Sequence, residues 1–102
     1  MMMSKPGFKI TGKSGFHITF ENHYTVSVQF NWGCYCDGYD DPQVIDKMIS
    51  GEGRTECPNA EVAVWGRDGN LIEMPEFGGN TVGSYYTPEM VFDLLSWAKE
   101  QK

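Results

Sequence analysis

GFHITFENHYTVSVQF, residues 15–30, is the stretch that decides the fold of this chain. Apolar and polar side chains alternate along both of its halves, from Phe16 to Phe20 and again from Tyr24 to Phe30. A period of two is typical of strands that bury one face and leave the other polar. The stretch therefore predicts an antiparallel hairpin.

The register of this hairpin determines the length of its turn. A two-residue loop would set Phe20 opposite a polar side chain and turn one apolar face outward. A three-residue loop that ends at His23 instead sets Phe20 opposite Tyr24. The same register sets Ile18 opposite Val26. The last residue of such a loop has a left-handed backbone, which histidine tolerates better than most residues, so we expect a positive φ angle at His23.

A second hairpin is predicted over residues 61–74, around the Arg-Asp-Gly turn at 67–69. A three-residue loop is again needed to keep the apolar positions in register. The pairs that it predicts are Val64 with Ile72, Val62 with Met74 and Trp65 with Leu71. Because this hairpin is apolar on both faces, we expect a helix to cover one of them.

Capping signals delimit two helices. Residues 41–51 predict a short middle helix, and Thr87 followed by Pro88 predicts the start of a C-terminal helix that ends near Glu100. The apolar stripe expected to face the core is Met90, Val91, Leu94, Leu95, Trp97 and Ala98. With a short strand over residues 8–11, the whole pattern predicts one α+β domain, residues 1–102. Its antiparallel sheet would have four or five strands, formed by two hairpins and the short N-terminal strand, with the two helices packed on it.

Composition restricts the partners. The chain has 102 residues and a formal net charge of −6, with only 8 Lys and Arg in total. Binding to a nucleic-acid backbone requires clustered basic residues, so we expect none, whereas contact with a basic protein surface is permitted. The chain shows no signal peptide and no apolar run of transmembrane length, which predicts no membrane association. Its 3 cysteines cannot all pair, which is typical of reduced thiols in a cytoplasm.

Metal and catalytic signatures are weak. Cys34, Cys36 and Cys57 could bind zinc with a histidine as fourth ligand, either His17 or His23, but structural zinc sites usually recruit ligands in pairs spaced by two residues. The acidic loop with Asp37, Asp40 and Asp41 does not match the pattern of a calcium loop. A Cys–His pair lacks a third group to orient it. We therefore predict no cofactor, no metal and no enzymatic activity.

Two sets of residues are candidates for binding. Aromatic and acidic side chains suit contact with a basic protein surface. This partner-binding set is Tyr35, Asp37, Tyr39, Asp40 and Phe92, the last of which projects from the C-terminal helix away from its apolar stripe. The glycine-rich connection before that helix suits a small polar ligand. This ligand-binding set is Gly79, Asn80, Thr81, Ser84, Tyr85 and Tyr86, with Arg67 or a neighbouring subunit supplying positive charge.

The polar face of the first hairpin is a third candidate. It comprises His17, Thr19, Ser27, Gln29 and Asn31. Exposure to solvent is the simpler interpretation of this face. The alternative is association of two subunits, because an uncovered antiparallel edge favours pairing with another chain. A homo-oligomer is therefore one possible state.

The stretches GFHITFENHYTVSVQFNWGCYCD (15–37), EVAVWGRDGNLIEM (61–74) and GSYYTPEMVFDLL (83–95) together resemble a set of small proteins encoded in bacteriophage genomes. These proteins share the FENxYTVSVQF…YC hairpin, the EVAxWxxDGN hairpin and a closing helix. A glycine is usual where this chain has His23, which agrees with the positive φ angle expected there. The resemblance implies a phage context and brings no assigned activity with it.

We therefore interpret the chain as a non-enzymatic phage protein that inhibits a host function in the host cytoplasm, such as a defence system. It would either block a host protein or sequester a small signalling molecule. One alternative is a structural or virion-associated oligomer. The other is a zinc- or thiol-dependent enzyme.

Overall fold

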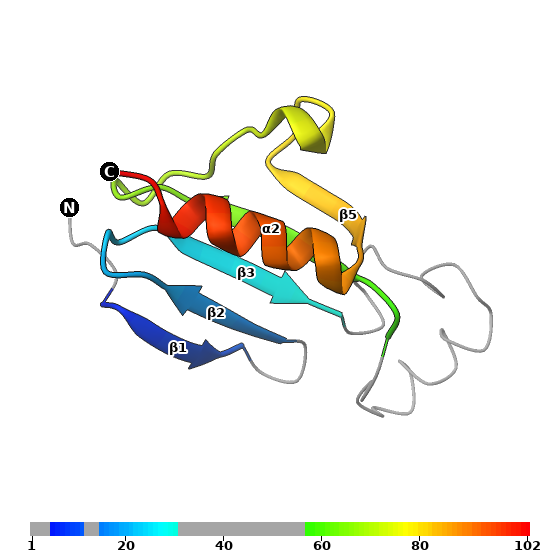
Figure 1. Cartoon of the computed structure of the whole chain (residues 1–102), viewed down its shortest axis with the longest axis horizontal. Coiled ribbons are helices and arrows are strands. Elements are labelled where there is room, and N and C mark those ends of the chain that lie inside the picture. The colour runs from blue at the N-terminus through cyan, green and yellow to red at the C-terminus, as the bar shows by residue number, and fades with distance from the viewer. Residues whose placement is uncertain (1–4, 12–14, 31–56) are drawn as a thin grey trace.

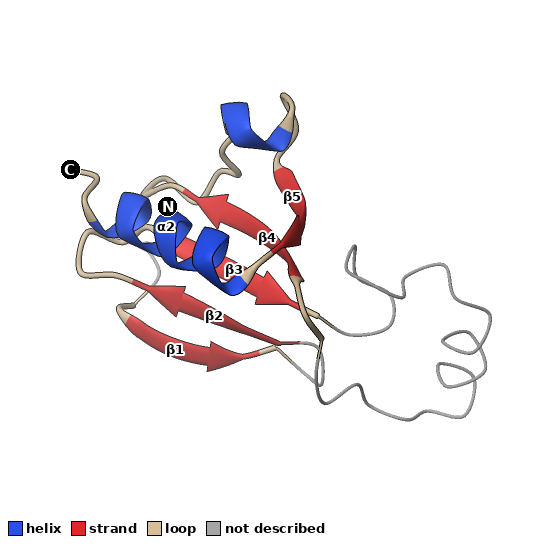
Figure 2. Cartoon of the chain, turned by 45° about the vertical axis from the view of Figure 1, so that its right-hand side comes forward, coloured by secondary structure: helices blue, strands red, loops and turns tan. Residues whose placement is uncertain are grey.

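The computed structural model describes residues 5–11, 15–30 and 57–102. One antiparallel sheet has the strand order β1-β2-β3-β4-β5, and helix α2 lies across one of its faces (Figures 1 and 2). The strands are β1 (Gly7–Ile10), β2 (Gly15–Thr19), β3 (Thr25–Gln29), β4 (Ala60–Trp65) and β5 (Val82–Tyr86). The helices are the short 3-10 helix η1 (Pro75–Phe77) and α2 (Pro88–Lys99). This confirms the predicted α+β class, while the middle helix predicted at 41–51 lies outside the described residues.

The first hairpin has the predicted register. Ile18 lies opposite Val26, and the backbone N–H of Phe20 donates to the carbonyl of Tyr24 at 3.0 Å. His23 closes the three-residue loop with a φ angle of 69°, as the alternation of the two strands required. The hairpin therefore places Val26 and Val28 of β3 on the inner face of the sheet.

The pairing predicted for the second hairpin is confirmed next to its turn and is wrong at the end of its second strand. Trp65 pairs with Leu71, and the N–H of Ile72 donates to the carbonyl of Val64 at 2.9 Å. Met74 does not continue this ladder, because its N–H donates to the carbonyl of Asn80 at 3.4 Å and the chain turns into the 3-10 helix η1 at Pro75. β5 takes the place of the missing arm, so that Val62 lies opposite Gly83 instead of Met74. Residues 82–86, expected as a loop, are therefore an edge strand.

The core lies between the sheet and α2. Val26 and Val28 of β3 face Val64 and Val62 of β4, and all four side chains are buried. The helix side chains that complete this core are Leu94 and Ala98, from the predicted apolar stripe. Burial of one valine or leucine side chain contributes about 1.5–3 kcal/mol, so this layer is the main source of stability for the described residues.

The opposite face of the sheet is polar yet only partly exposed. The rings of His17 in β2 and Trp65 in β4 lie with their centroids 5.2 Å apart, although their strands are roughly 10 Å apart. The two rings therefore meet over β3, which lies between those strands, and leave Thr25 and Ser27 only 5% exposed each. The expectation that this face is simply solvent-exposed is thus wrong at Ser27, while His17, Thr19 and Gln29 are half-buried. Asn31 lies outside the described residues.

The turn of the first hairpin holds the end of α2. The side-chain amide of Asn22 donates to the carbonyl of Ala98 at 2.8 Å and to that of Gln101 at 2.7 Å. Because the last carbonyls of a helix lack the usual partners within the helix, they are available to accept these bonds from the turn. Next to them, the rings of Tyr24 and Trp97 make an edge contact with centroids 6.1 Å apart. The turn therefore determines where α2 ends on the sheet.

Replacing Asn22 with alanine should destabilise the protein by about 1–3 kcal/mol, because the variant loses two short hydrogen bonds to the carbonyls at the end of α2. Chemical denaturation would measure this change. The control is Glu21→Ala at the exposed neighbouring position, which should change stability by no more than about 0.5 kcal/mol. Equal stability of the two variants would contradict a stabilising role for the hydrogen bonds between Asn22 and the end of α2.

Replacing Gly83 with alanine should lower stability by about 1–3 kcal/mol, because a Cβ atom there has no room. It would lie 2.6 Å from a ring carbon of Phe77 and 2.8 Å from one of Tyr86. A loss of this size lowers the melting temperature by about 4–8 °C for each kcal/mol. Ser84→Ala, at the exposed next position of β5, is the matched control, and an unchanged melting temperature for Gly83→Ala would contradict this packing.

Candidate functional site

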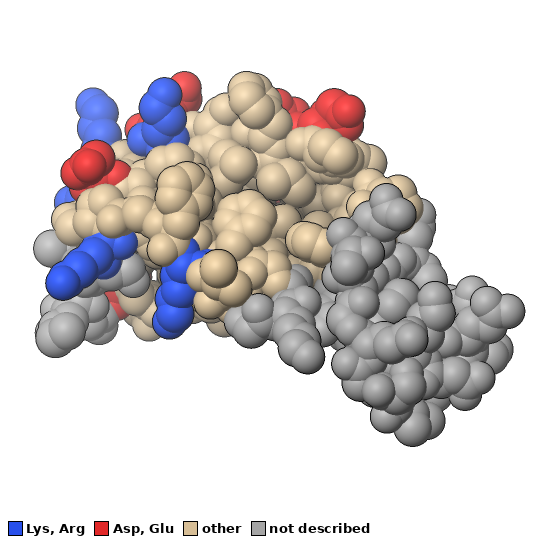
Figure 3. Space-filling view, turned by 90° about the horizontal axis from the view of Figure 1, so that it is seen from below, with Lys and Arg blue, Asp and Glu red and all other residues tan. Residues whose placement is uncertain are grey.

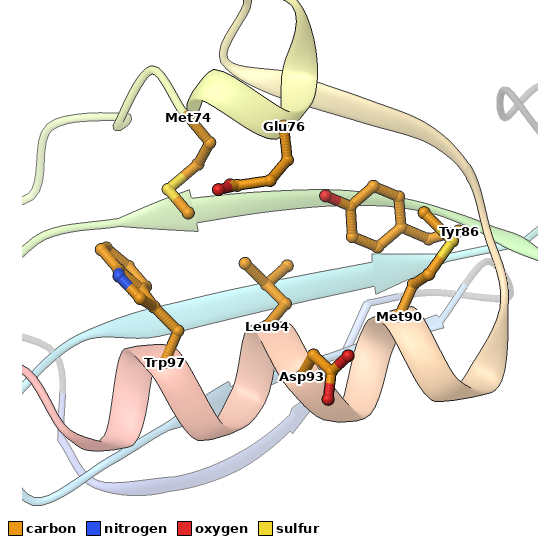
Figure 4. A pocket seen from close by; sticks show the side chains of 7 residues that line it. All are labelled: Met74, Glu76, Tyr86, Met90, Asp93, Leu94 and Trp97. Atoms are coloured by element: carbon orange, nitrogen blue, oxygen red, sulfur yellow. The ribbon is translucent and has the colours of Figure 1, made fainter.

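A pocket of about 250 Å³ opens between η1, the end of β5 and one side of α2 (Figure 4). We call it the acidic pocket. Its lining residues are Met74, Glu76, Tyr86, Met90, Asp93, Leu94 and Trp97. Two of them are carboxylates, and the other five are aromatic or apolar.

Helical spacing brings four of these side chains together. Met90, Asp93, Leu94 and Trp97 follow one another at intervals of three, one and three residues, which places them on one side of α2. The departure of Met74 from the second hairpin places η1 over this side of the helix, and Glu76 projects from η1 into the space between them (Figure 4). The pocket therefore depends on η1, which begins directly after the predicted second hairpin at residue 75.

The walls of the acidic pocket are apolar and held by packing. Met74, Tyr86 and Leu94 are buried, with only 5–6% of each residue exposed to solvent. Met90 is 41% exposed and lies at the mouth of the pocket. Figure 4 shows Met74 and Trp97 facing one another at one end and Tyr86 beside Met90 at the other. An edge contact with Phe77, at a centroid distance of 5.6 Å, fixes the ring of Tyr86.

The electrostatic character of this pocket is negative. Its lining includes no lysine, arginine or histidine, and no described basic side chain forms a salt bridge with Glu76 or Asp93. Burial, and then the nearby Glu76 carboxylate, raise the pKa of Tyr86, so its hydroxyl remains protonated at neutral pH and can donate a hydrogen bond. The arrangement suits a ligand with an apolar body and a positive charge.

The predicted ligand-binding set is not brought together. Tyr86 pairs with Ala60 at the start of β4, while Arg67 follows the end of that strand, roughly 17 Å away along its length. Arg67 donates from Nε to the carbonyl of Asn22 at 3.3 Å and lines a separate hollow with Tyr24 and Asp68. Arg67 therefore does not supply charge next to Tyr86.

The remaining members of that set lie along the turn after η1 and the outer edge of the sheet. Asn80 donates from its amide to the carbonyl of Phe77 at 3.2 Å, and Gly79 has a φ angle of 85°. Thr81 is half-buried, and Ser84 is exposed on β5. Tyr85 is 47% exposed with a φ angle of 57°, at a bulge where β5 has one more residue than β4. Among the predicted ligand residues, only Tyr86 lines the acidic pocket.

Of the predicted partner-binding set, the structure describes only Phe92. It is 68% exposed, as expected, and borders an apolar groove of about 500 Å³ with Phe16, Phe30 and Leu95. In a view from the β1 side of the molecule, charged side chains stand around the margin of the surface and its middle is uncharged (Figure 3). Tyr35, Asp37, Tyr39 and Asp40 lie outside the described residues.

The cysteine and metal predictions concern mostly other parts of the chain. Cys57 is half-buried and borders the apolar groove, while Cys34 and Cys36 lie outside the described residues, as does Asp41. Within residues 5–11, 15–30 and 57–102, no group of three His, Cys, Asp or Glu side chains could hold a metal ion. No helix in this part of the chain is both long and apolar enough to cross a bilayer.

A hollow of opposite sign lies beside β1. It measures about 440 Å³, and its lining includes Lys5, Lys9, His17, Thr19 and Thr25. Burial, and then the charge of Lys9, lower the pKa of His17 below its ordinary value of 6.5. We call this the basic hollow, because no acidic side chain is among its lining residues.

Sequence reasoning missed the acidic pocket for two reasons. It assigned Met90, Leu94 and Trp97 to the core and did not consider that Asp93 lies on the same side of the helix. That spacing was visible in the sequence. The position of Glu76 was not, because it depends on the chain leaving the second hairpin after Met74.

Comparison of the chain with family models, with curated proteins and with solved structures finds no match. Its function is therefore inferred from the geometry and charge of these sites.

The lowered pKa of His17 predicts a loss of stability in mild acid. The unfolded chain takes up the proton first as the pH falls below about 6.5, so stability is present above that pH and decreases as the pH falls through the folded-state pKa. Thermal unfolding at about pH 7.5 and about pH 5.5 would measure this effect. His17→Gln should show a smaller difference between the two melting temperatures than the wild type, and an equal difference would contradict the prediction.

Proposed function

We propose that this chain is a phage-encoded, non-enzymatic binding protein that inhibits a host function by covering a surface of a host protein in the host cytoplasm. The acidic pocket is the observation that supports this proposal most directly. Its walls are aromatic and methionine side chains, which are enriched in protein interfaces, and its two exposed carboxylates are complementary to a basic side chain of a partner. The resemblance of the hairpins to phage-encoded proteins supports the phage context.

The lining of the acidic pocket favours binding over catalysis. Its titratable groups are two carboxylates and one phenol, and it contains no cysteine, serine, threonine, lysine or histidine. A nucleophile next to a base with a third group to orient it is therefore not formed by these residues. Binding requires no such arrangement.

The volume and the charge of each site indicate which of the two modes of inhibition, blocking a host protein or sequestering a small molecule, it would serve. Small-molecule pockets typically measure about 300–1,000 Å³. The acidic pocket, at about 250 Å³, is small and negative, which favours a side chain of a protein. The basic hollow, at about 440 Å³ with Lys5 and Lys9, supports the second candidate function, sequestration of an anionic signalling molecule.

No described strand pairs with the outer edge of β1, and this edge supports association of two copies as part of either function. β1 is the terminal strand of the sheet, and its Phe8 and Ile10 are 81% and 80% exposed. An edge strand with exposed apolar side chains favours pairing with another strand. A virion-associated oligomer would use the same edge.

Native mass spectrometry of the tagged protein recovered from phage-infected cells tests these proposals together. We expect a host protein at fixed stoichiometry with the wild type, and a loss of its occupancy with the double variant Glu76→Gln, Asp93→Gln. Each lost charged contact should weaken binding by about tenfold or more. The matched control is Glu21→Gln, Glu73→Gln, which removes the same charge at exposed positions outside the acidic pocket.

The control variant should retain the host protein. Equal capture by both double variants would contradict a role for the acidic pocket. A bound small anion with no host protein would instead favour sequestration, and recovery of the protein in purified phage particles would favour the virion alternative.

A further inference from the structure

We propose that the acidic pocket accepts the side chain of one arginine from the partner protein. This inference rests on the proposed function, since it specifies the chemistry of the group that the host protein inserts. It concerns Glu76 and Asp93 as acceptors, Trp97 and Tyr86 as aromatic walls, and Met74 and Met90 as flexible apolar contacts.

The volume of the pocket suits a single side chain. About 250 Å³ is below the usual range of about 300–1,000 Å³ for sites that enclose a drug-sized molecule. The floor is Leu94, which is 5% exposed, and it gives an inserted aliphatic stem an apolar surface to cover. Long basic side chains commonly bury their stems in this way while their charged ends reach polar groups.

The charges of the pocket require a cation. Glu76 projects from η1 over the helix, while the Asp93 carboxylate lies on the near side of α2 and points away from Glu76 (Figure 4). Both carboxylates are exposed to solvent. No hydrogen bond or salt bridge to a described residue occupies either of them. A cation that enters the pocket can form charge-assisted hydrogen bonds with a carboxylate of its lining, which are roughly twice as strong as neutral ones.

Arginine fits this arrangement better than lysine. Its planar guanidinium stacks on aromatic rings, is weakly hydrated and presents five N–H donors in a fork that matches the geometry of a carboxylate. The lysine ammonium is a compact point charge that loses more hydration when it enters a site with buried walls. Arginine is also enriched in protein interfaces, where lysine is depleted.

The pocket is held in shape before any ligand enters. The edge contact with Tyr24 positions Trp97, and the edge contact with Phe77 positions Tyr86. The Asn22 bonds hold the end of α2, from which Trp97 projects. Little conformational entropy is therefore lost on binding at these walls, which favours affinity.

NMR titration of the full chain tests this inference without the host protein. The probes are N-acetyl-arginine methylamide and, as the comparison, N-acetyl-lysine methylamide at equal ionic strength. We expect saturable shifts of the Trp97 indole N–H and of the Met74 and Met90 methyl groups with the arginine probe. The Trp65 indole, on the opposite face of the sheet, is the internal reference and should not shift.

The arginine probe should bind at least about fivefold more tightly than the lysine probe, which corresponds to roughly 1 kcal/mol. The double variant Glu76→Gln, Asp93→Gln should weaken it by about tenfold or more, while Glu21→Gln, Glu73→Gln should leave it unchanged. The amide spectra show directly whether each variant is folded. The titration of the wild type needs no variant, so the inference can fail even if the pocket variant does not fold.

Equal binding of the two probes would overturn the assignment of arginine, and the absence of saturable shifts would overturn the cation site. Loss of host-protein capture by the pocket variant with no response to the arginine probe would leave the proposed function standing and overturn this inference. A specific response to the arginine probe without any host protein in the native spectra would support the inference and count against the proposed function.

Discussion

The hydrogen bonds from the side-chain amide of Asn22 to the end of α2 connect the first turn of the sheet to the last turn of the helix. They join residues separated by 76 and 79 positions in the chain. Because this turn is rigid, with its three-residue loop closed at His23, it determines where the helix crosses the sheet. The side of α2 that lines the acidic pocket is oriented by the same contact.

The acidic pocket itself exists because the second hairpin stops early. The N–H of Met74 donates to the carbonyl of Asn80 instead of to β4, and the chain turns into η1 at Pro75 and returns as β5. Gly83 makes this return possible, since a side chain there would collide with Phe77. As a result, η1 lies above α2 and places Glu76 over the helix.

Charge is distributed unevenly over a protein whose net value is −6. Carboxylates line the pocket beside α2, while Lys5, Lys9 and His17 surround the basic hollow beside β1. A local field can oppose the total charge, so two sites of opposite sign can coexist on one small domain. This separation gives the two candidate functions different places on the molecule, and the pocket variants affect only one of them.

Local patterns in the sequence were sufficient for the first hairpin, the tip of the second and both ends of α2. Strand register depends on a period of two, and helix ends depend on residues such as Thr87 and Pro88, so neighbours in the chain decide them. The tertiary structure alone decided that β5 replaces the arm at Met74, that the rings of His17 and Trp65 meet over β3, and that Glu76 faces α2. Each of these brings together residues from separate elements, and alternation along a single strand contains no information about which element packs against it.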